Sequence, residues 1–287
     1  MTLADQKATI ARTSEAFVNA NPSAETVTRA AREVLNDSAE RGGGVQMLNV
    51  DKIYPGATNK ALDNFNLEIN PGEMVVLLGG SGCGKSTALR SLAGLEDIQA
   101  GRILVGGQDV TGVPVNKRNM AMVFQAYSLF PHMTALQNVE FGLEIRGMGK
   151  TERRKQAMEK LELVGLADQA GKYTQQMSGG QQQRVAAARA LVTDPTMIMA
   201  DEPTGALDSK SARLLLESLE ALNRRLRATV LMVTHDSFAA SYTSRVLFIR
   251  DGKIFTELRR GDTDRREFFD RIMEVVAMMG GEGSDAL

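Results

Sequence analysis

Residues 79–87 read GGSGCGKST and match the pattern G-x-x-x-x-G-K-[ST]. They follow residues 73–78, an almost continuous apolar run that predicts a strand buried on both faces, and they lead into a helical pattern at 85–92. Glycines allow a backbone to wrap closely around an anion, and the start of a helix adds unpaired amide donors. The stretch therefore predicts a phosphate-binding loop formed by Gly79, Gly80, Ser81, Gly82, Cys83, Gly84, Lys85, Ser86 and Thr87.

Within this loop, two side chains have an expected role in binding a nucleoside triphosphate. We expect Lys85 to neutralise the β- and γ-phosphates and Ser86 to ligate Mg²⁺. Cys83 is the single cysteine of the chain, and we expect it to serve as a small loop residue. One cysteine excludes both a disulfide framework and a metal site built from cysteines.

An acidic pair follows a second apolar run. Residues 196–200 read TMIMA and precede Asp201 and Glu202. A carboxylate at the end of a buried strand beside a phosphate loop can hold Mg²⁺, and a second one can orient or deprotonate water for attack on the γ-phosphate. We therefore assign Asp201 to the metal and Glu202 to the role of catalytic base.

Composition narrows the class of protein. The 287 residues carry 34 basic and 35 acidic side chains, which argues against a dedicated nucleic-acid or membrane-surface binder. The first thirty residues lack an apolar signal-peptide core, and no apolar run approaches the roughly 20 residues that cross a bilayer. We expect a cytoplasmic protein that needs a partner for any role at a membrane.

The chain divides into three segments. Residues 1–44 predict a helical extension ending in a glycine linker, either loosely docked or acting as a docking or regulatory arm. Residues 45–261 predict strands at 46–54, 61–69, 119–124, 196–200 and 229–233 and helices at 151–164, 181–192 and 209–226. This alternation predicts an α/β fold with a parallel sheet.

Asp251-Gly252 predicts a hairpin. Residues 262–287 predict an amphipathic helix whose apolar face holds Phe268, Phe269, Ile272, Val276 and Met279.

Residues 177–184, MSGGQQQR, exclude most other classes of phosphate-loop protein. They form a Ser-Gly-Gly turn that opens a helix, and so predict a second anion-binding helix start. The octet resembles the signature sequence of the ATP-binding cassette (ABC) ATPases. The resemblance covers about 45–261 and extends to four further motifs of that family: Tyr54 for the adenine-stacking aromatic, Gln125 for the Q-loop, Asp208 for the D-loop and His235 for the switch histidine. Met177, in place of the usual leucine, and Ala200 depart slightly from the family pattern.

The resemblance implies a fold and a shared-site mechanism. The fold would be a P-loop NTPase with a RecA-like parallel-sheet core, an antiparallel β subdomain and an α-helical subdomain at about 126–183. Two ATPase domains, as a homodimer, would clamp each ATP between the phosphate loop of one copy and Ser178, Gly179, Gly180 and Gln181 of the other. Hydrolysis of ATP would use Glu202, His235 and Gln125, with Mg²⁺ bound by Ser86, Gln125 and Asp201.

The resemblance also implies a membrane permease as partner, which would hold the protein on the inner face of the cell membrane. Residues after the Q-loop would contact that permease, namely Tyr127, Leu129, Phe130 and Met133. The alternative is that these residues belong to the core of the helical subdomain. We expect His132 to be structural, and we expect the clusters Arg153-Arg154-Lys155, Arg224-Arg225 and Arg265-Arg266 to be solvated helix faces.

The two halves resemble different subfamilies. Residues 45–190 are similar to ATPases of importers for polyamines, sugars or amino-acid-like solutes, whereas residues from about 197 onward are similar to ATPases of bacitracin-resistance transporters. The short tail after Gly261 favours the second type, so we expect an antimicrobial-peptide system, with a solute importer as the alternative. A non-transport ABC protein and a small-molecule kinase fit the motifs less well.

Overall fold

The structure is a computed structural model that describes residues 44–126 and 128–281. The chain divides into two units, residues 1–40 and 41–287, and the described residues all belong to the second. Apart from Gly44, the predicted N-terminal extension lies outside the described residues, as does Tyr127.

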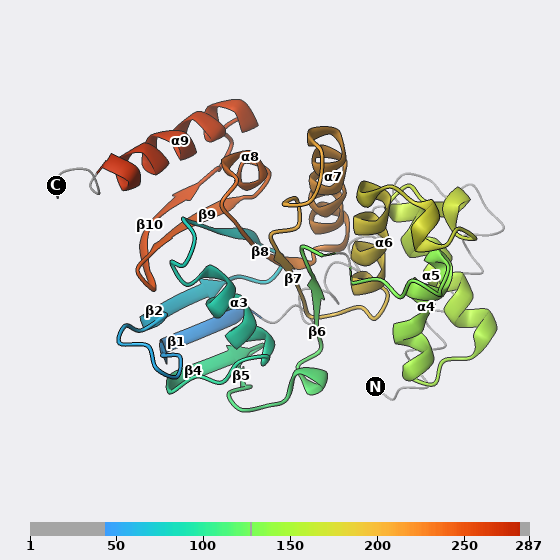
Figure 1. Cartoon of the computed structure of the whole chain (residues 1–287), viewed down its shortest axis with the longest axis horizontal. Coiled ribbons are helices and arrows are strands. Elements are labelled where there is room, and N and C mark those ends of the chain that lie inside the picture. The colour runs from blue at the N-terminus through green and yellow to red at the C-terminus, as the bar shows by residue number, and fades with distance from the viewer. Residues whose placement is uncertain (1–43, 127, 282–287) are drawn as a thin grey trace, which may run out of the picture. The chain divides into compact units, whose positions relative to one another are not determined.

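The described residues form a central six-stranded sheet with the strand order β10-β9-β3-β8-β7-β6 (Figure 1). Neighbouring strands are parallel except for β10, which runs antiparallel to β9 at the edge. All residues of β3, β7 and β8 are buried, which explains why these segments are continuously apolar rather than alternating. The predicted parallel α/β core is confirmed. Its strands are β3 (Met74–Leu78), β6 (Met120–Val123), β7 (Met197–Asp201), β8 (Thr229–Thr234), β9 (Arg245–Arg250) and β10 (Lys253–Arg259).

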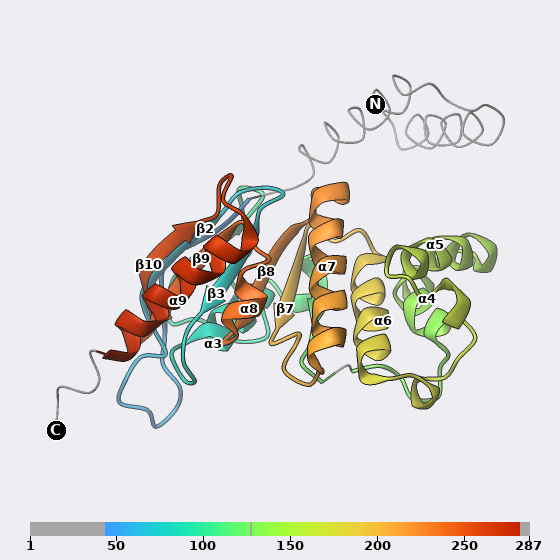
Figure 2. The same cartoon turned by 90° about the horizontal axis from the view of Figure 1, so that it is seen from above.

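Different layers cover the two faces of this sheet (Figure 2). Met74, Val76 and Leu78 of β3 belong to an apolar cluster with four helices on one face. Val75 and Leu77 point the other way, into a cluster with α3 (Lys85–Ala93) and a second sheet. Successive side chains of β3 point to opposite faces of the sheet, so this one strand packs against both layers. The four helices are α6 (Gly179–Leu191), α7 (Ser209–Leu226), α8 (Ser237–Ala240) and α9 (Arg265–Gly281).

The second sheet of the described region is antiparallel, in the order β2-β1-β4-β5. Its strands are β1 (Val45–Lys52), β2 (Leu62–Ile69), β4 (Ala100–Val105) and β5 (Gln108–Asp109). The first two match predicted strands, whereas β4 and β5 were not predicted. Gly101 lets β4 cross β1 closely, because its φ is +91° and a Cβ there would lie 2.5 Å from the Leu48 carbonyl oxygen.

A third apolar cluster joins α6 to α4 (Ala135–Ile145) and α5 (Lys150–Leu163). The helix α4 was not predicted, although its start carries a recognisable signal. The Thr134 hydroxyl accepts a hydrogen bond from the Gln137 amide, and the Gln137 side-chain oxygen accepts one from the Thr134 amide, which is a capping box. Leu129 packs against this cluster, and the Phe130 ring lies 4.6 Å from that of Phe141. Short 3-10 helices lie at Val115–Lys117, Ala167–Gln169 and Thr174–Gln176.

The C-terminal part packs back onto the central sheet. Asp251 and Gly252 have φ values of +50° and +74° and connect β9 to β10, as the hairpin prediction required. On α9, Phe268 and Ile272 are fully buried, and Val276 and Met279 pack against the same cluster. Phe269 departs from the predicted apolar face, because it lines a surface pocket instead.

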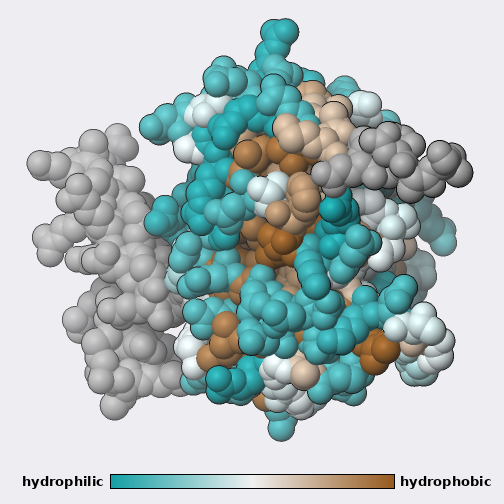
Figure 3. All heavy atoms as spheres, turned by 90° about the vertical axis from the view of Figure 1, so that its left-hand side faces the viewer, coloured by the Kyte–Doolittle hydropathy of each residue, from teal (hydrophilic) through white to brown (hydrophobic). Residues whose placement is uncertain are grey.

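The face that carries α9 and β10 exposes an apolar strip among polar side chains (Figure 3). The large exposed apolar side chains of these two elements are Phe255, Met273 and Met278. The Arg250 guanidinium lies 4.7 Å from the centre of the Phe255 ring, which shields part of that ring by a cation–π contact. Among the helices within 44–126 and 128–281, none is both long enough and apolar enough to span a bilayer.

Asp208 forms the N-cap of α7. Its carboxylate accepts hydrogen bonds from the backbone amides of Lys210 and Ser211, both at 3.0 Å, and from the Ser211 hydroxyl at 2.7 Å. The bonds from the Ser211 hydroxyl and amide are the main cause that holds the pKa of Asp208 below its usual range.

Phe268→Ala tests whether α9 is part of the core. The substitution should lower the free energy of unfolding by about 3–5 kcal/mol, because it removes a fully buried ring. Met278→Ala on the same helix removes an exposed side chain and should change stability by less than about 0.5 kcal/mol. Thermal or urea unfolding measures both, and equal effects would contradict this packing.

Asp208→Asn tests the charge at the cap of α7. The folded-state pKa of Asp208 is lowered, so its ionised form adds stability that is present above the unfolded value of 3.8 and is lost as pH falls through the folded value. Asparagine caps a helix about as well but does not titrate. Wild type should therefore exceed the variant slightly in melting temperature at pH 7, and the difference should vanish on acidification. A difference that grows at low pH would refute the assignment.

Candidate nucleotide-binding site

The predicted phosphate loop joins the carboxyl end of β3 to the start of α3. Gly84 is the N-cap of α3 with φ +107°, and a Cβ there would lie 2.5 Å from the Ala61 carbonyl oxygen. The Cys83 carbonyl oxygen accepts a hydrogen bond from the Gly252 amide at 3.0 Å. The loop is therefore held from both sides, by the segment before β2 and by the β9–β10 turn.

Lys85 lies buried at this loop. Its Nζ donates to the carbonyl oxygens of Gly79 (2.8 Å) and Gly80 (2.7 Å) and lies 3.8 Å from the Cys83 Sγ. No acidic side chain among residues 44–126 and 128–281 forms an ion pair with it. A buried cation held only by neutral carbonyl groups suits the binding of an anion.

Ser86 and Asp201, two predicted Mg²⁺ ligands, meet across the site. The Ser86 hydroxyl donates to Asp201 Oδ1 at 3.1 Å, and Arg90 Nη2 lies 3.9 Å from Asp201 Oδ2. Asp201 ends β7, and Ser86 is in the first turn of α3. Hydroxyl and carboxylate oxygens are the hard donors that Mg²⁺ prefers, so this pair fits the metal that the sequence predicts.

Glu202 and His235 lie at the ends of two neighbouring strands. Asp201 is in register with Val233, and the Glu202 amide donates to the Val233 carbonyl at 2.9 Å. The Glu202 carboxylate accepts from the Thr234 hydroxyl (3.0 Å) and lies 3.1 Å from His235 Nδ1. Glu202 has φ +47°, a conformation uncommon for a residue with a side chain. The backbone thus holds this carboxylate in a strained, specific position.

Gln125 and Tyr54 reach the site from two other segments. Gln125 follows β6, and a Cβ on Gly205 would lie 2.7 Å from its Nε2, so it contacts the loop after Glu202. The Tyr54 hydroxyl bonds to Glu96 Oε2 (2.5 Å) and to Thr87 Oγ1 (3.2 Å). Partial burial, followed by the hydrogen bond to Glu96, raises the pKa of Tyr54. The phenol therefore stays neutral, and its ring is anchored beside the start of α3.

The predicted signature residues begin α6. The Ser178 hydroxyl accepts from the Gln181 amide (3.4 Å), and the Gln181 side chain accepts from the Ser178 amide (2.9 Å). Gly180 packs against Ser211 of α7, where a Cβ would lie within 2.5 Å of the Ser211 side chain. Within the described part of the chain, no hydrogen bond joins 178–181 to 79–87. Within one copy, the start of α3 and the start of α6, the two predicted phosphate-binding segments, are therefore not joined by a hydrogen bond.

Three polar side chains of this region were not predicted. Thr234 holds Glu202, Glu96 anchors Tyr54, and Gln183 of α6 donates to two loops of the site. Thr234 directly precedes His235, and Gln183 lies in the same helix as the signature residues, so local sequence offered a weak signal for both. Glu96 offered none, because its role depends on the fold bringing Tyr54 to it.

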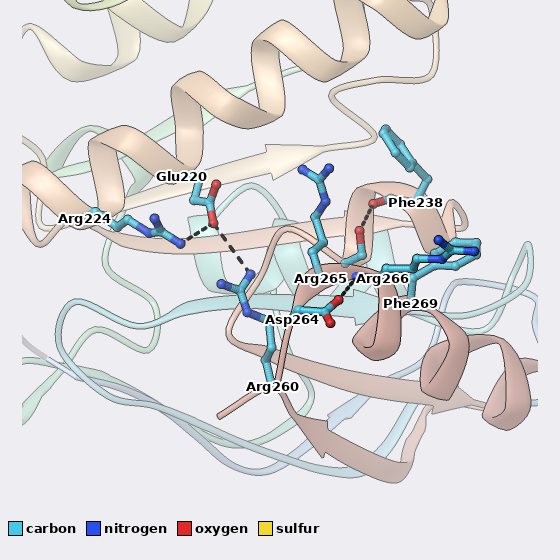
Figure 4. Close-up of a pocket in the computed structure, with 9 residues that line it drawn as sticks. Glu220, Arg224, Phe238, Arg260, Asp264, Arg265, Arg266 and Phe269 are labelled. Carbon is cyan, nitrogen blue, oxygen red and sulfur yellow. Dashed lines mark hydrogen bonds and ion pairs between the residues drawn. The ribbon is translucent and has the colours of Figure 1, made fainter. Parts of the chain in front are cut away.

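A separate cavity of about 540 Å³ lies between α7, α8 and the start of α9 (Figure 4). It lies near the amino ends of the parallel strands, since the Arg260 amide donates to the Ser244 carbonyl just before β9. Two basic clusters expected on solvated helix faces contribute Arg224, Arg265 and Arg266 to its wall, and these three side chains are exposed, as that expectation requires. Glu220 pairs with Arg224 at 2.8 Å, and Arg265 lies over the Tyr242 ring at 4.3 Å.

The chain is similar to known proteins over most of its length. The family model described as "ABC transporter" matches residues 62–205. An Fe(3+) ions import ATP-binding protein of Rhizobium etli is 48% identical over 213 residues, covering 74% of this chain and 60% of that protein. A bacitracin export ATP-binding protein of Halalkalibacterium halodurans is 40% identical over 253 residues, covering 84% of this chain and 98% of that protein. The chain spans about three fifths of the length of the iron-import relatives.

Solved structures agree in fold and in sequence. The dimeric structure of MJ0796, a bacterial ABC transporter cassette, has a TM-score of 0.68 and 38% identity, and it matches over 75% of this chain and 98% of its own. The same cassette in a post-hydrolysis state bound to ADP and Pi has a TM-score of 0.67 and 37% identity over the same shares. The order of strands, the phosphate loop, the acidic strand end and these similarities lead to one conclusion: the chain belongs to the ABC transporter family, as an ATP-binding cassette.

Proposed function

We propose that the protein is the ATP-hydrolysing subunit of a membrane transporter. The observation that supports this most directly is the gathering of Lys85, the Ser86–Asp201 pair and Glu202 at the carboxyl ends of neighbouring parallel strands. In such sheets, ligands bind outside the carboxyl ends of the strands. The fold thus brings a cation, two hard oxygen donors and a positioned carboxylate to one edge.

The proposed chemistry assigns a task to each group. Backbone amides of the loop and Lys85 bind the β- and γ-phosphates. Ser86, Asp201 and Gln125 hold Mg²⁺, which when bound neutralises charge on the phosphate oxygens. Glu202 accepts the proton of the attacking water or orients it, while Thr234 and His235 keep its carboxylate aimed. Tyr54 provides an aromatic face for the adenine base.

A second copy of the chain would complete each site. In one copy, the start of α6 forms no hydrogen bond with the phosphate loop among the described residues. The capping box uses the amides of Ser178 and Gln181, so the Ser178 hydroxyl and the amides of Gly179 and Gly180 are the donors that would face another molecule's nucleotide. The similar MJ0796 cassette has a dimeric structure. We propose a head-to-tail homodimer in which the γ-phosphate bridges the two copies. Such a dimer closes with ATP and opens after hydrolysis, because ADP lacks that bridge.

For the cargo, solute import is the first candidate. The importer ATPases are the more identical relatives, 47–48% over 213–218 residues, and their names state Fe(3+) as cargo. Export of an antimicrobial peptide is the second candidate. It is supported by the bacitracin export protein, which is matched over 98% of its length at 40% identity. In both cases a membrane permease would hold the ATPase at the inner face of the cell membrane.

Glu202→Gln tests the proposed ATPase cycle. It should leave ATP binding intact and reduce hydrolysis by about a hundredfold or more, because the amide cannot accept the proton. With ATP and Mg²⁺, the variant should accumulate as a dimer in size-exclusion chromatography with light scattering. The matched control Glu202→Gln/Lys85→Ala should stay monomeric, since the cation of the phosphate loop is gone. Wild-type turnover in Glu202→Gln would rule out the base assignment.

Purification of the membrane partner from its native host distinguishes the two cargoes. A tagged chain should copurify with a permease, and import predicts that a substrate-binding protein stimulates the ATPase activity of the complex. Export of a peptide predicts stimulation by bacitracin-type peptides instead. A chain that copurifies with no integral membrane protein would argue against a transport role.

A further inference from the structure

Gln183 lies between the signature helix α6 and the two loops that carry Gln125 and Glu202. It lies in α6, one turn after Gly180, and its side chain is fully buried. Its Nε2 donates to the Phe124 carbonyl oxygen at 3.0 Å and to the Pro203 carbonyl oxygen at 3.1 Å. Phe124 directly precedes Gln125, and Pro203 directly follows Glu202. One amide group therefore ties the signature helix to the two loops that carry Gln125 and Glu202.

The orientation of this amide follows from its partners. Both neighbours are carbonyl oxygens, so only the NH₂ group can face them, and the two N–H bonds of that group are both used. Gln183 Oε1 is buried and has no hydrogen-bond partner among the described residues. An apolar side chain of the same length would avoid this desolvation cost. A half-satisfied buried amide is therefore better explained by the two links it makes than by stability.

The two loops that Gln183 joins also contact each other. A Cβ on Gly205 would lie 2.7 Å from Gln125 Nε2, and the Gly205 amide donates to the Glu202 carbonyl at 3.0 Å. At the other end, Gly180 packs directly on Ser211 of α7. The start of α6 has little room to move by itself, so a shift of this helix reaches Phe124 and Pro203 through hydrogen bonds and packed atoms.

We propose that Gln183 couples the two ATP sites of the dimer. The inference rests on the proposed function, in which Ser178 of one copy binds the ATP of the other, whereas Gln125 and Glu202 act on the ATP of their own copy. Engagement of Ser178 by the distant nucleotide pulls on α6, and Gln183 passes that displacement to the Gln125 and Glu202 loops. Gln183 is thus a positioning residue that makes hydrolysis at one site depend on closure at the other.

The matched control is the neighbouring residue. Gln182 Nε2 also donates to two backbone carbonyl oxygens, those of Thr174 and Met177, at 3.0 Å each. These links stay within the helical segment that carries the signature, so Gln182→Met removes the same number of bonds without releasing the two catalytic loops. Comparison of Gln183→Met with Gln182→Met separates coupling from a general loss of amide hydrogen bonds.

Steady-state ATP hydrolysis by the full chain tests the coupling. Gln183→Met should lower kcat by about tenfold or more while changing ATP affinity, measured with a fluorescent ATP analogue, by less than about twofold. Gln182→Met should lower kcat by at least about fivefold less than Gln183→Met does, because its links do not reach Phe124 or Pro203. Adding Ser178→Ala should cost at least about fivefold less in the Gln183→Met background than in wild type, because the link that carries part of its effect is already absent. Strictly multiplicative effects would overturn the proposal.

Hydrogen exchange gives a readout that needs no turnover. In a Glu202→Gln background, ATP should slow exchange in the peptides that contain 121–126 and 202–206, and Gln183→Met should abolish that slowing while Gln182→Met keeps it. Gln183→Leu provides a second apolar variant. If both Gln183 variants melt as unfolded chains, or both retain the ATP-dependent slowing, the coupling role is wrong. A wild-type chain without ATPase activity would instead refute the proposed function.

Discussion

Parallel pairing of β3, β8 and β7 is the constraint on which the rest of the structure depends. β8 lies between β3 and β7, in register along both. Because parallel strands end at the same edge, the loop after β3, the acidic pair at the end of β7 and His235 after β8 lie at one edge of the sheet. The residues of these strands are buried, so their position is set by packing on both faces. The polar side chains at this edge are therefore attached to a backbone whose position is fixed.

Several charges at this edge already have fixed partners. Asp201 is held by Ser86 and lies near Arg90, and Glu202 is held by Thr234 and His235. Lys85, in contrast, has no acidic partner among the described residues, and its Nζ contacts two carbonyl oxygens and the Cys83 Sγ. Groups that are oriented before the reaction need no rearrangement as charge develops, which is how an active site lowers a barrier most effectively. In the proposed function, the phosphates of ATP would provide the negative charge that Lys85 lacks here.

The helix α6 connects parts of the fold that are otherwise separate. Ala187, Ala190 and Leu191 pack in the cluster on the central sheet, whereas Val185, Ala188 and Val192 pack with α4 and α5. Its first turn carries the signature residues, and Gln183 ties it to the catalytic loops. A single helix thus packs in two apolar clusters. It also carries the signature residues and contacts the loops that hold Gln125 and Glu202. In the proposed mechanism, this placement would connect ATP-driven closure to the residues that hydrolyse ATP through packed and hydrogen-bonded atoms.

The amino-acid sequence by itself determined the phosphate loop, the buried strands and the hairpin turn at Asp251-Gly252, because each depends on neighbouring residues: a glycine pattern, an apolar run or a turn dipeptide. The order of the ABC motifs also allowed Tyr54, Gln125, Asp208 and His235 to be named. The predictions missed β4, which pairs with the distant strand β1, and β5, a two-residue strand that pairs with β4 across a tight turn. They also missed α4, although its capping box and the helical spacing of Leu136, Val139 and Leu143 were local cues.

Only the tertiary structure decided which side chains meet. The Tyr54–Glu96 and Glu202–Thr234 bonds and the convergence of Arg224 with Arg265 and Arg266 join residues from different elements. The two carbonyl partners of Gln183 lie 59 and 20 residues away in the chain. Periodicity and motifs report on neighbours along the chain, whereas these contacts arise where a sheet edge and helices from separate segments close on one another. The roles of these residues therefore follow from the fold and not from the local pattern.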